Sequence, residues 1–283
     1  MSRNTATIDG SKEKRRYLTL LAGTVALIGS LFIGIAAGAV PITLREVFEV
    51  IQGVTQSENY RIIYYIRMPR VICAALTGTN LALAGCILQG ILRNPLADPG
   101  IIGVTAGAGL AAMALMLISP ELTYFVPFAA FGGAVVASIV VFLLAWEHGI
   151  HPLRLILAGV AIAAFFGGGS AALSVFFSDR IQGTVNWMAG GFAGNSWRHV
   201  VMILPYSAVG IVATMCSYRK LNALQLGDDV AASLGLNVER VRFFLLALSA
   251  LLAASAVSVA GLLGFVGLII PHIMRLIVGS DFE

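Results

Sequence analysis

The strongest constraint on this fold is a series of long stretches that contain no Asp, Glu, Lys or Arg. A helix needs about 20 apolar residues to cross the roughly 30 Å of hydrocarbon in a bilayer, because only a helix satisfies its own backbone hydrogen bonds there. The charge-free stretches lie at residues 17–44, 71–92, 99–120, 122–146, 155–178, 181–197, 199–218 and 243–274. They predict an all-α fold, a polytopic transmembrane helical bundle.

Two of these stretches do not correspond to single spans. Residues 181–197 contain Gln182, Asn186, Asn195 and four glycines, so we expect a partial or re-entrant helix there. Residues 243–274 are too long for one crossing and contain several glycines and Pro271, so we divide this region into spans at about 243–260 and 262–279. The sequence therefore predicts eight spans in one transmembrane domain, residues 1–283.

Composition excludes a soluble enzyme and predicts an orientation. The chain is 58% hydrophobic and 11% charged, whereas a soluble domain is about 25% charged. With residues 1–16 in the cytoplasm, the cytoplasmic segments hold twelve of the 18 Lys and Arg residues, as the positive-inside rule favours. We expect a multi-pass membrane protein, surrounded by lipid, with no nucleic-acid partner. Residues 17–44 exceed the apolar region of a signal peptide, so we expect them to be retained.

The sequence contains no nucleotide-binding or metal-binding motif. None of the three lysines, Lys12, Lys14 and Lys220, follows a glycine, so the chain lacks the Gly-Lys-Ser/Thr of a P-loop. No carboxylate lies deep in a predicted span, where ion-coupled carriers usually hold one. His148 and His151 lack a third ligand, so we expect no metal. We expect no cofactor in this chain and an energy source that lies in another subunit.

The longest cytoplasmic segment, residues 218–242, has the pattern of a short amphipathic helix. Asp228 and Asp229 suit a helix N-terminus and Gly235 suits the residue after its end. Leu226, Val230 and Leu234 recur at four-residue spacing and form an apolar stripe. The stripe either lies on the protein's own bundle or on lipid headgroups, or docks a soluble partner.

The motif Arg67-Met68-Pro69-Arg70 precedes the second span on the outer face, where the positive-inside rule disfavours cations. Its two arginines, three residues apart, can point the same way. They either extend to the membrane interface or bind carboxylates of an external partner.

On the inner face, residues 93–100 contain two prolines that prevent a simple helical hairpin, and Arg93 and Asp98 are placed to pair. Such a segment is either a connector or, if it reaches membrane depth, a gate. The small residues of the fifth span and the segment after it either pack helices closely or leave room for a pathway. These are Gly167, Gly168, Gly169, Ser170, Asn186, Gly190 and Gly191.

Together these segments resemble the FecCD family, the permeases of ABC importers for ferric siderophores, haem and vitamin B12. The resemblance is carried by motifs that occur in order over residues 67–279. They are Arg67 to Arg70, then Gly78, Ala82, Gly85 and Gln89, then Asn94 to Pro99 with Gly103, then Gly227 to Gly235, and finally Gly264 to His272.

The resemblance implies a permease that dimerises with a second copy or a paralogue around a pathway at the interface. It implies that Arg67 and Arg70 receive acidic residues of an extracytoplasmic substrate-binding protein. It assigns a cytoplasmic gate to Asn94, Pro95 and Leu96, together with His151 and Pro152. It assigns coupling to an ABC ATPase subunit to a larger set: Leu226, Gly227, Asp228, Asp229, Val230, Ala231, Leu234, Gly235 and Arg240.

Family members have about ten spans, so we expect a C-terminal part to be missing after Glu283. The predicted function is translocation of an iron-siderophore, haem or cobalamin-like chelate, driven by ATP hydrolysis in a partner chain. Two alternatives are an ion-coupled secondary transporter and a non-transporting membrane scaffold subunit.

Overall fold

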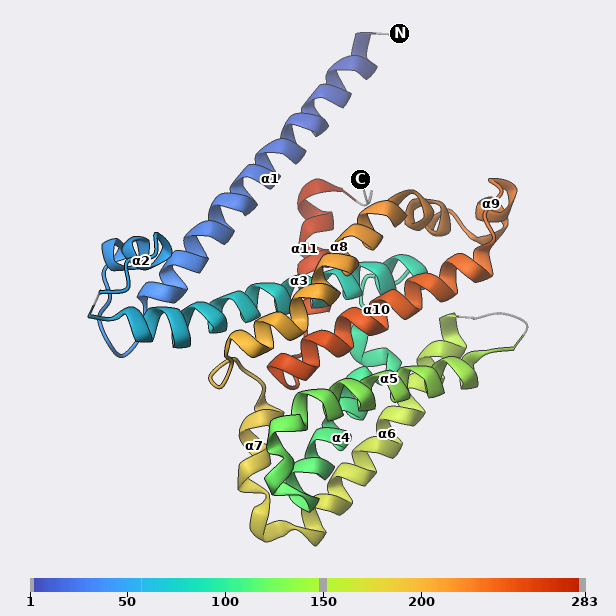
Figure 1. Cartoon of the computed structure of the whole chain (residues 1–283). Coiled ribbons are helices and arrows are strands. Elements are labelled where there is room, and N and C mark those ends of the chain that lie inside the picture. The colour runs from blue at the N-terminus through green and yellow to red at the C-terminus, as the bar shows by residue number, and fades with distance from the viewer. Residues whose placement is uncertain (1–2, 57, 148–151, 280–283) are drawn as a thin grey trace.

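A computed structural model describes residues 3–56, 58–147 and 152–279, with side chains from Lys14 onward, and its elements are helices (Figure 1). The long ones are α1 (Arg3–Ala36), α3 (Met68–Leu92), α5 (Val126–Ala145), α6 (Pro152–Phe176), α8 (Trp197–Gln225) and α10 (Val238–Ala260). The shorter ones are α2 (Leu44–Ile51), α4 (Val104–Ile118), α7 (Gln182–Ala189), α9 (Asp228–Ser233) and α11 (Val266–Val278). A π-helical turn, Ile62–Arg67, precedes α3, and 3-10 turns lie at Pro99–Ile102, Pro120–Phe125 and Ser178–Arg180.

Within the described residues, six helices are long and apolar enough to cross a membrane. The other two predicted spans correspond to α4 and α11, which are apolar but shorter. The expected spans at 99–120 and 262–279 were therefore too long at their N-terminal ends. Gly103 has a left-handed backbone with φ of 74° and separates a 3-10 turn from α4. Gly261 and Phe265, with φ of 70° and 65°, delay the start of α11.

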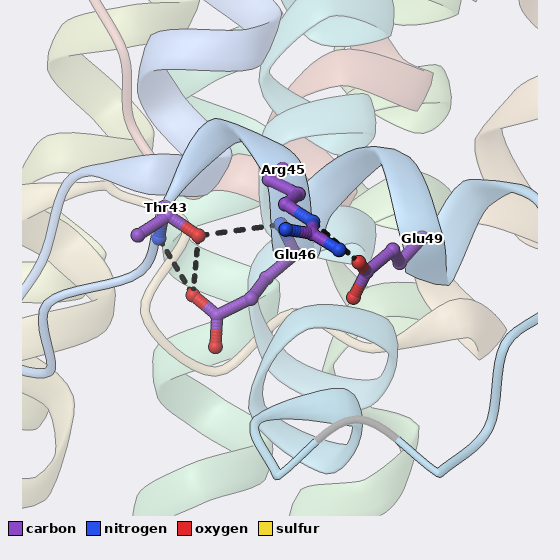
Figure 2. Close-up of polar contacts among 4 residues, drawn as sticks. All are labelled: Thr43, Arg45, Glu46 and Glu49. Atoms are coloured by element: carbon purple, nitrogen blue, oxygen red, sulfur yellow. Dashed lines mark hydrogen bonds and ion pairs between the residues drawn. The ribbon is translucent and has the colours of Figure 1, made fainter.

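The first span ends earlier than the charge-free stretch 17–44 predicts, because α1 stops at Ala36. The chain then forms α2, which begins with a capping box (Figure 2). Glu46 N–H donates to the Thr43 hydroxyl, and Thr43 N–H donates to the Glu46 carboxylate at 2.7 Å. That backbone hydrogen bond lowers the pKa of Glu46, so the box is retained until the pH falls below the usual range of a glutamate.

The bundle is built around α10, which packs against α3, α5 and α8 (Figure 1). Its faces are made of alanines, serines and leucines, and 15 of its residues are buried. Polar contacts connect it to α3, since Ser249 donates to the Ala84 carbonyl at 3.0 Å and Asn80 donates to Ser255 at 2.9 Å. Small residues let helix backbones approach closely in a membrane, where apolar burial alone does not drive association.

The hydrogen bond that Pro271 removes from α11 is replaced by one buried side chain of α3. Pro271 has no N–H to bond the Gly267 carbonyl four residues earlier. The Gln89 side-chain amide donates to the carbonyl oxygens of Gly267 and Leu268 at 3.3 and 3.2 Å, and to that of Ala97 at 3.3 Å. Gln89 therefore stabilises both a proline-interrupted helix and the loop after α3.

Contacts between loops divide the molecule into two ends. At the outer end, defined by residues 37–61 and 190–196, the Trp197 indole donates to the Tyr64 carbonyl at 2.8 Å and Gly191 N–H donates to the Ala260 carbonyl at 2.7 Å. At the inner end, defined by residues 93–98 and 226–237, Arg93 pairs with Asp228. The loops are grouped as the charge distribution predicts.

We expect Gly85→Ala to destabilise the bundle strongly, because a Cβ at Gly85 would collide with the backbone carbonyl of Gly267. Overpacking of this kind costs about 1–3 kcal/mol. Gly78 lies on the same helix with open space around it, so Gly78→Ala is the matched control and should be neutral or stabilising by up to about 1 kcal/mol. Thermal unfolding of the two variants in detergent measures the difference, and equal unfolding temperatures would contradict the close approach of α3 and α11.

Candidate functional site

Arg67 is not exposed for docking at the outer end. It is buried, with an exposed fraction of 7%. Its guanidinium donates to the carbonyl oxygens of Ile35, Ala36 and Val40 at 2.9, 2.6 and 2.6 Å. The last carbonyls of a helix have no partner within it, and Arg67 satisfies them at the end of α1. The expectation that Arg67 and Arg70 form an equivalent, outward pair is therefore wrong in its geometry.

Arg70 occupies a different environment. It is half-buried, and its Nη2 donates to the Ala193 carbonyl at 2.7 Å, which ties the start of α3 to the loop after α7. The motif analysis did not single out Arg198, whose guanidinium carbon lies 3.1 Å from the centroid of the Tyr124 ring and whose Nη2 donates to the Tyr124 carbonyl. One signal for Arg198 was present in the sequence, because the predicted orientation places this cation on the outer side, where the positive-inside rule disfavours it.

The predicted pathway residues line two separate hollows. One, of about 400 Å³, lies at the outer end and is lined by Asn186, Gly190 and Gly191 together with the end of α10 and His199. The other, of about 500 Å³, lies between α6 and α4 and is lined by Gly167 and Ser170, with Met188 and Leu262 at its edge. Both hollows therefore border α7 and the loop that follows α10.

The remaining two pathway candidates of α6 differ from each other. Gly168 is exposed, whereas the backbone of Gly169 faces the side chain of Leu110. Much of α6 is exposed, and Leu155 and Gly159 are its buried residues. A Cβ on Gly159 would collide with the Ile101 carbonyl, so this glycine lets α6 approach the 3-10 turn before α4.

The predicted gate at the inner end is an ordered turn. The Asn94 side-chain oxygen accepts from Leu96 N–H at 3.0 Å, while Pro95 and Leu96 are exposed. Asp98 accepts from Gly100 N–H at 2.8 Å, and burial raises the pKa of its carboxyl. The expected Arg93–Asp98 pair is wrong, because Arg93 turns to Asp228. Pro152 begins α6, and His151 lies outside the described residues, as does His148.

The predicted short helix is confirmed as α9, but it spans only Asp228–Ser233, so Val230 lies within it, Leu234 directly follows it and Leu226 lies at the end of α8. Asp228 and Asp229 occupy its first turn, and Gly235 follows with φ of 83°. The stripe of Leu226, Val230 and Leu234 is exposed, with fractions of 65%, 43% and 63%. Ala231 is fully buried beneath the helix, so α9 rests on the bundle by a small residue and leaves its large apolar side chains outward.

Two further residues of the predicted coupling set lie outside α9, one directly before it and one in the helix that follows. Gly227, with φ of 113°, precedes the helix in a backbone conformation that side chains disfavour. Arg240 lies in the first turn of α10, and its N–H donates to the Asn237 side-chain oxygen at 3.1 Å, an N-cap. Asp228 faces inward, because Arg242 Nη2 and Arg93 Nη2 both donate to its Oδ1, at 2.8 and 3.0 Å. Asp229 is exposed.

Comparison with known proteins gives a consistent set of relatives. A family model described as the FecCD transport family matches residues 26–283. The Fe(3+)-citrate import system permease protein YfmE of Bacillus subtilis is 38% identical over 270 residues, covering 95% of this chain and 81% of the relative. The cobalamin import system permease protein BtuC of Halobacterium salinarum is 39% identical over 217 residues, covering 76% of this chain and 59% of the relative.

Among solved structures, a metal-chelate type ABC transporter in an inward-facing conformation is similar with a TM-score of 0.80 and 29% identity. The alignment covers 94% of this chain and 83% of that chain. The likeness extends over nearly the whole helical bundle rather than over one motif.

We expect Arg67→Met to lower the stability of the protein, because it removes hydrogen bonds to three carbonyls at the end of α1. Hydrogen bonds to charged groups contribute about 1.5–3 kcal/mol each. Because bonds that share one guanidinium do not add fully, we expect a loss of at least about 3 kcal/mol. The control is Arg61→Met, since Arg61 is exposed just before the π-helical turn. Chemical denaturation in detergent compares the two, and equal midpoints would mean that Arg67 does not hold the end of α1.

Proposed function

The chain belongs to the FecCD transport family, and from that membership we propose that it is the membrane-spanning permease subunit of an ABC importer. The single observation that carries the proposal is α9, whose apolar stripe is exposed at the end of the bundle that also holds the loop 93–98. A soluble ATPase can cover such a stripe and displace it. Lipid headgroups could also contact the stripe, but they would provide no energy for transport.

We propose that ATP is bound and hydrolysed by a separate ATPase subunit, with no cofactor in this chain. The sequence supports this, since none of its three lysines follows a glycine as a P-loop requires. An ion-coupled mechanism has less support. The buried polar side chains of the described residues include no carboxylate, the group that ion-coupled carriers usually bury.

We propose that a metal chelate of the iron-siderophore, haem or cobalamin type is the cargo, delivered by an extracytoplasmic binding protein. The names of the relatives, an Fe(3+)-citrate permease and a cobalamin permease, support that class. At the outer end, we propose that Arg70 binds a carboxylate of the binding protein. Arg67 does not share that role, because the Arg67 guanidinium is already bonded to carbonyls of this chain.

We propose that two permease chains, identical or paralogous, form the pathway in a prokaryotic cell membrane. Support comes from α6, which buries little of its surface and borders a hollow at Gly167 and Ser170. A second chain against this face would enclose the hollow. Asn186, Gly190 and Gly191 would then line the outer part of the same route.

Reconstitution tests the function directly. Proteoliposomes are prepared with the chain, its ABC ATPase subunit and its binding protein, and are offered radiolabelled ferric citrate, ferric hydroxamate, haem or cobalamin. We expect uptake of at least one of these probes only when ATP and both partners are present. Uptake without the ATPase would replace the proposal with secondary transport, and no uptake of any probe would favour a scaffold.

We expect Leu234→Asp to weaken binding of the ATPase subunit by tenfold or more, because it places a charge on the exposed stripe of α9. Apolar anchors at the centre of an interface typically contribute at least about 1–2 kcal/mol, and about 1.4 kcal/mol is tenfold in affinity. Ala232→Asp puts the same charge on α9 outside the stripe and should change affinity less than threefold. Titration of the labelled ATPase onto the chain in nanodiscs measures both, and equal effects would overturn docking through the stripe.

A further inference from the structure

One carboxylate oxygen at the inner end joins three segments that are distant in the sequence. Asp228 Oδ1, at the start of α9, accepts from Arg93 Nη2 at 3.0 Å and from Arg242 Nη2 at 2.8 Å. Arg93 ends α3 and Arg242 lies in α10. The carboxylate is therefore shared between two cations that would repel each other without it.

The two arginines are held very differently. The Arg242 side chain is 6% exposed and lies on the helix at the centre of the bundle, whereas the Arg93 side chain is 41% exposed. Removing the partner of a buried charge is costly, so Asp228 and Arg242 are expected to stay paired when α9 moves. Arg93 is the member of the group that can move.

Arg93 also connects directly to the predicted gate. It is the residue immediately before Asn94, and its backbone is left-handed with φ of 49°. Such a conformation is unfavourable for a residue with a side chain and persists only when its surroundings hold it. The guanidinium also lies against the backbone before α9, since a Cβ on Gly227 would be 3.6 Å from Arg93 Nη1. The orientation of the turn 94–96 is therefore tied to the position of α9.

We propose that Asp228 is a positioning residue that connects α9 to the gate turn through Arg93. When the ATPase subunit displaces α9, the Asp228–Arg93 ion pair moves the end of α3, and the turn at Asn94, Pro95 and Leu96 moves with it. The inference rests on the proposed function, because it needs a partner that moves α9. In this scheme Asp228 transmits movement within the chain, and the exposed apolar stripe contacts the ATPase subunit.

A purely structural role for Asp228 would be to neutralise Arg242. The two roles separate at Arg93, because Arg93→Met removes the Asp228–Arg93 pair and keeps both partners of the Asp228–Arg242 pair, which are 2.8 Å apart in the parent chain. The variant alters a side chain that is 41% exposed, so we expect it to fold. Arg93→Lys keeps the cation and restores the link. Arg219→Met removes another exposed arginine of the inner end, bonded to Tyr218, and is the matched control.

The experiment follows the gate turn with a nitroxide on Leu96→Cys, in a chain whose Cys73, Cys86 and Cys216 are replaced by alanine. The labelled chain is assembled with its ABC ATPase subunit in nanodiscs, and the spectrum is recorded before and after ATP with vanadate. We expect a large mobility change in the parent chain, in Arg93→Lys and in Arg219→Met. We expect at least a fivefold smaller change in Arg93→Met, with ATPase affinity within twofold of the parent.

The outcomes separate this inference from the proposed function. A full response of the label in Arg93→Met, or no response in the parent chain with ATPase bound, would overturn the link through Asp228 and leave the permease assignment intact. Failure of the parent chain to bind the ATPase at all would overturn the proposed function, and the inference with it.

Discussion

The fold depends on the requirement that every backbone N–H and C=O inside a bilayer find a partner within the protein. Long helices meet it automatically, and the places where the helices are broken need side chains. Gln89 bonds the Gly267 carbonyl freed by Pro271 and the next one along the chain, and Arg67 bonds carbonyls at the end of α1 and in the loop after it. Asp98 caps the turn before α4. Gln89 and Arg67, two of the larger buried polar residues, therefore bond the backbone where it is irregular, whereas the buried serines of α10 lie inside a regular helix.

The same requirement separates structural residues from functional ones. An arginine at a helix end first donates hydrogen bonds to the unpaired carbonyls there. Only the N–H groups that are left can bind another protein. Arg67 is fully used within the chain, Arg70 is used in part at Ala193, and Arg242 is held by Asp228. Arginines that look equivalent in the sequence thus have different roles: some cap helix ends, some bond loops, and others remain exposed. The half-exposed Arg93, which pairs with Asp228 beside the predicted gate turn, is the arginine to which we assign a functional role.

Close backbone contacts give the bundle the rigidity that transmission needs. Side chains cannot be added at Gly85 without meeting Gly267, or at Gly107 without meeting Gly133. Helices in such contact move as units. Ala231 beneath α9 and Asp228 at its start are the contacts that connect this short helix to the bundle. The two hollows beside α7 lie where this packing is open.

The sequence by itself determined the class of fold, the number and order of the apolar helices, the grouping of loops at two ends and the amphipathic helix at 228–233, because hydropathy and short-range helix signals are local properties. It missed α2, although Thr43 and Glu46 have the spacing of a capping box. Only the tertiary structure decided that Arg67 is buried, that α4 and α11 start late, and that Arg93 pairs with Asp228 rather than Asp98. These outcomes depend on which atoms of distant segments meet, and no local pattern encodes the competition of several carbonyls and carboxylates for one guanidinium.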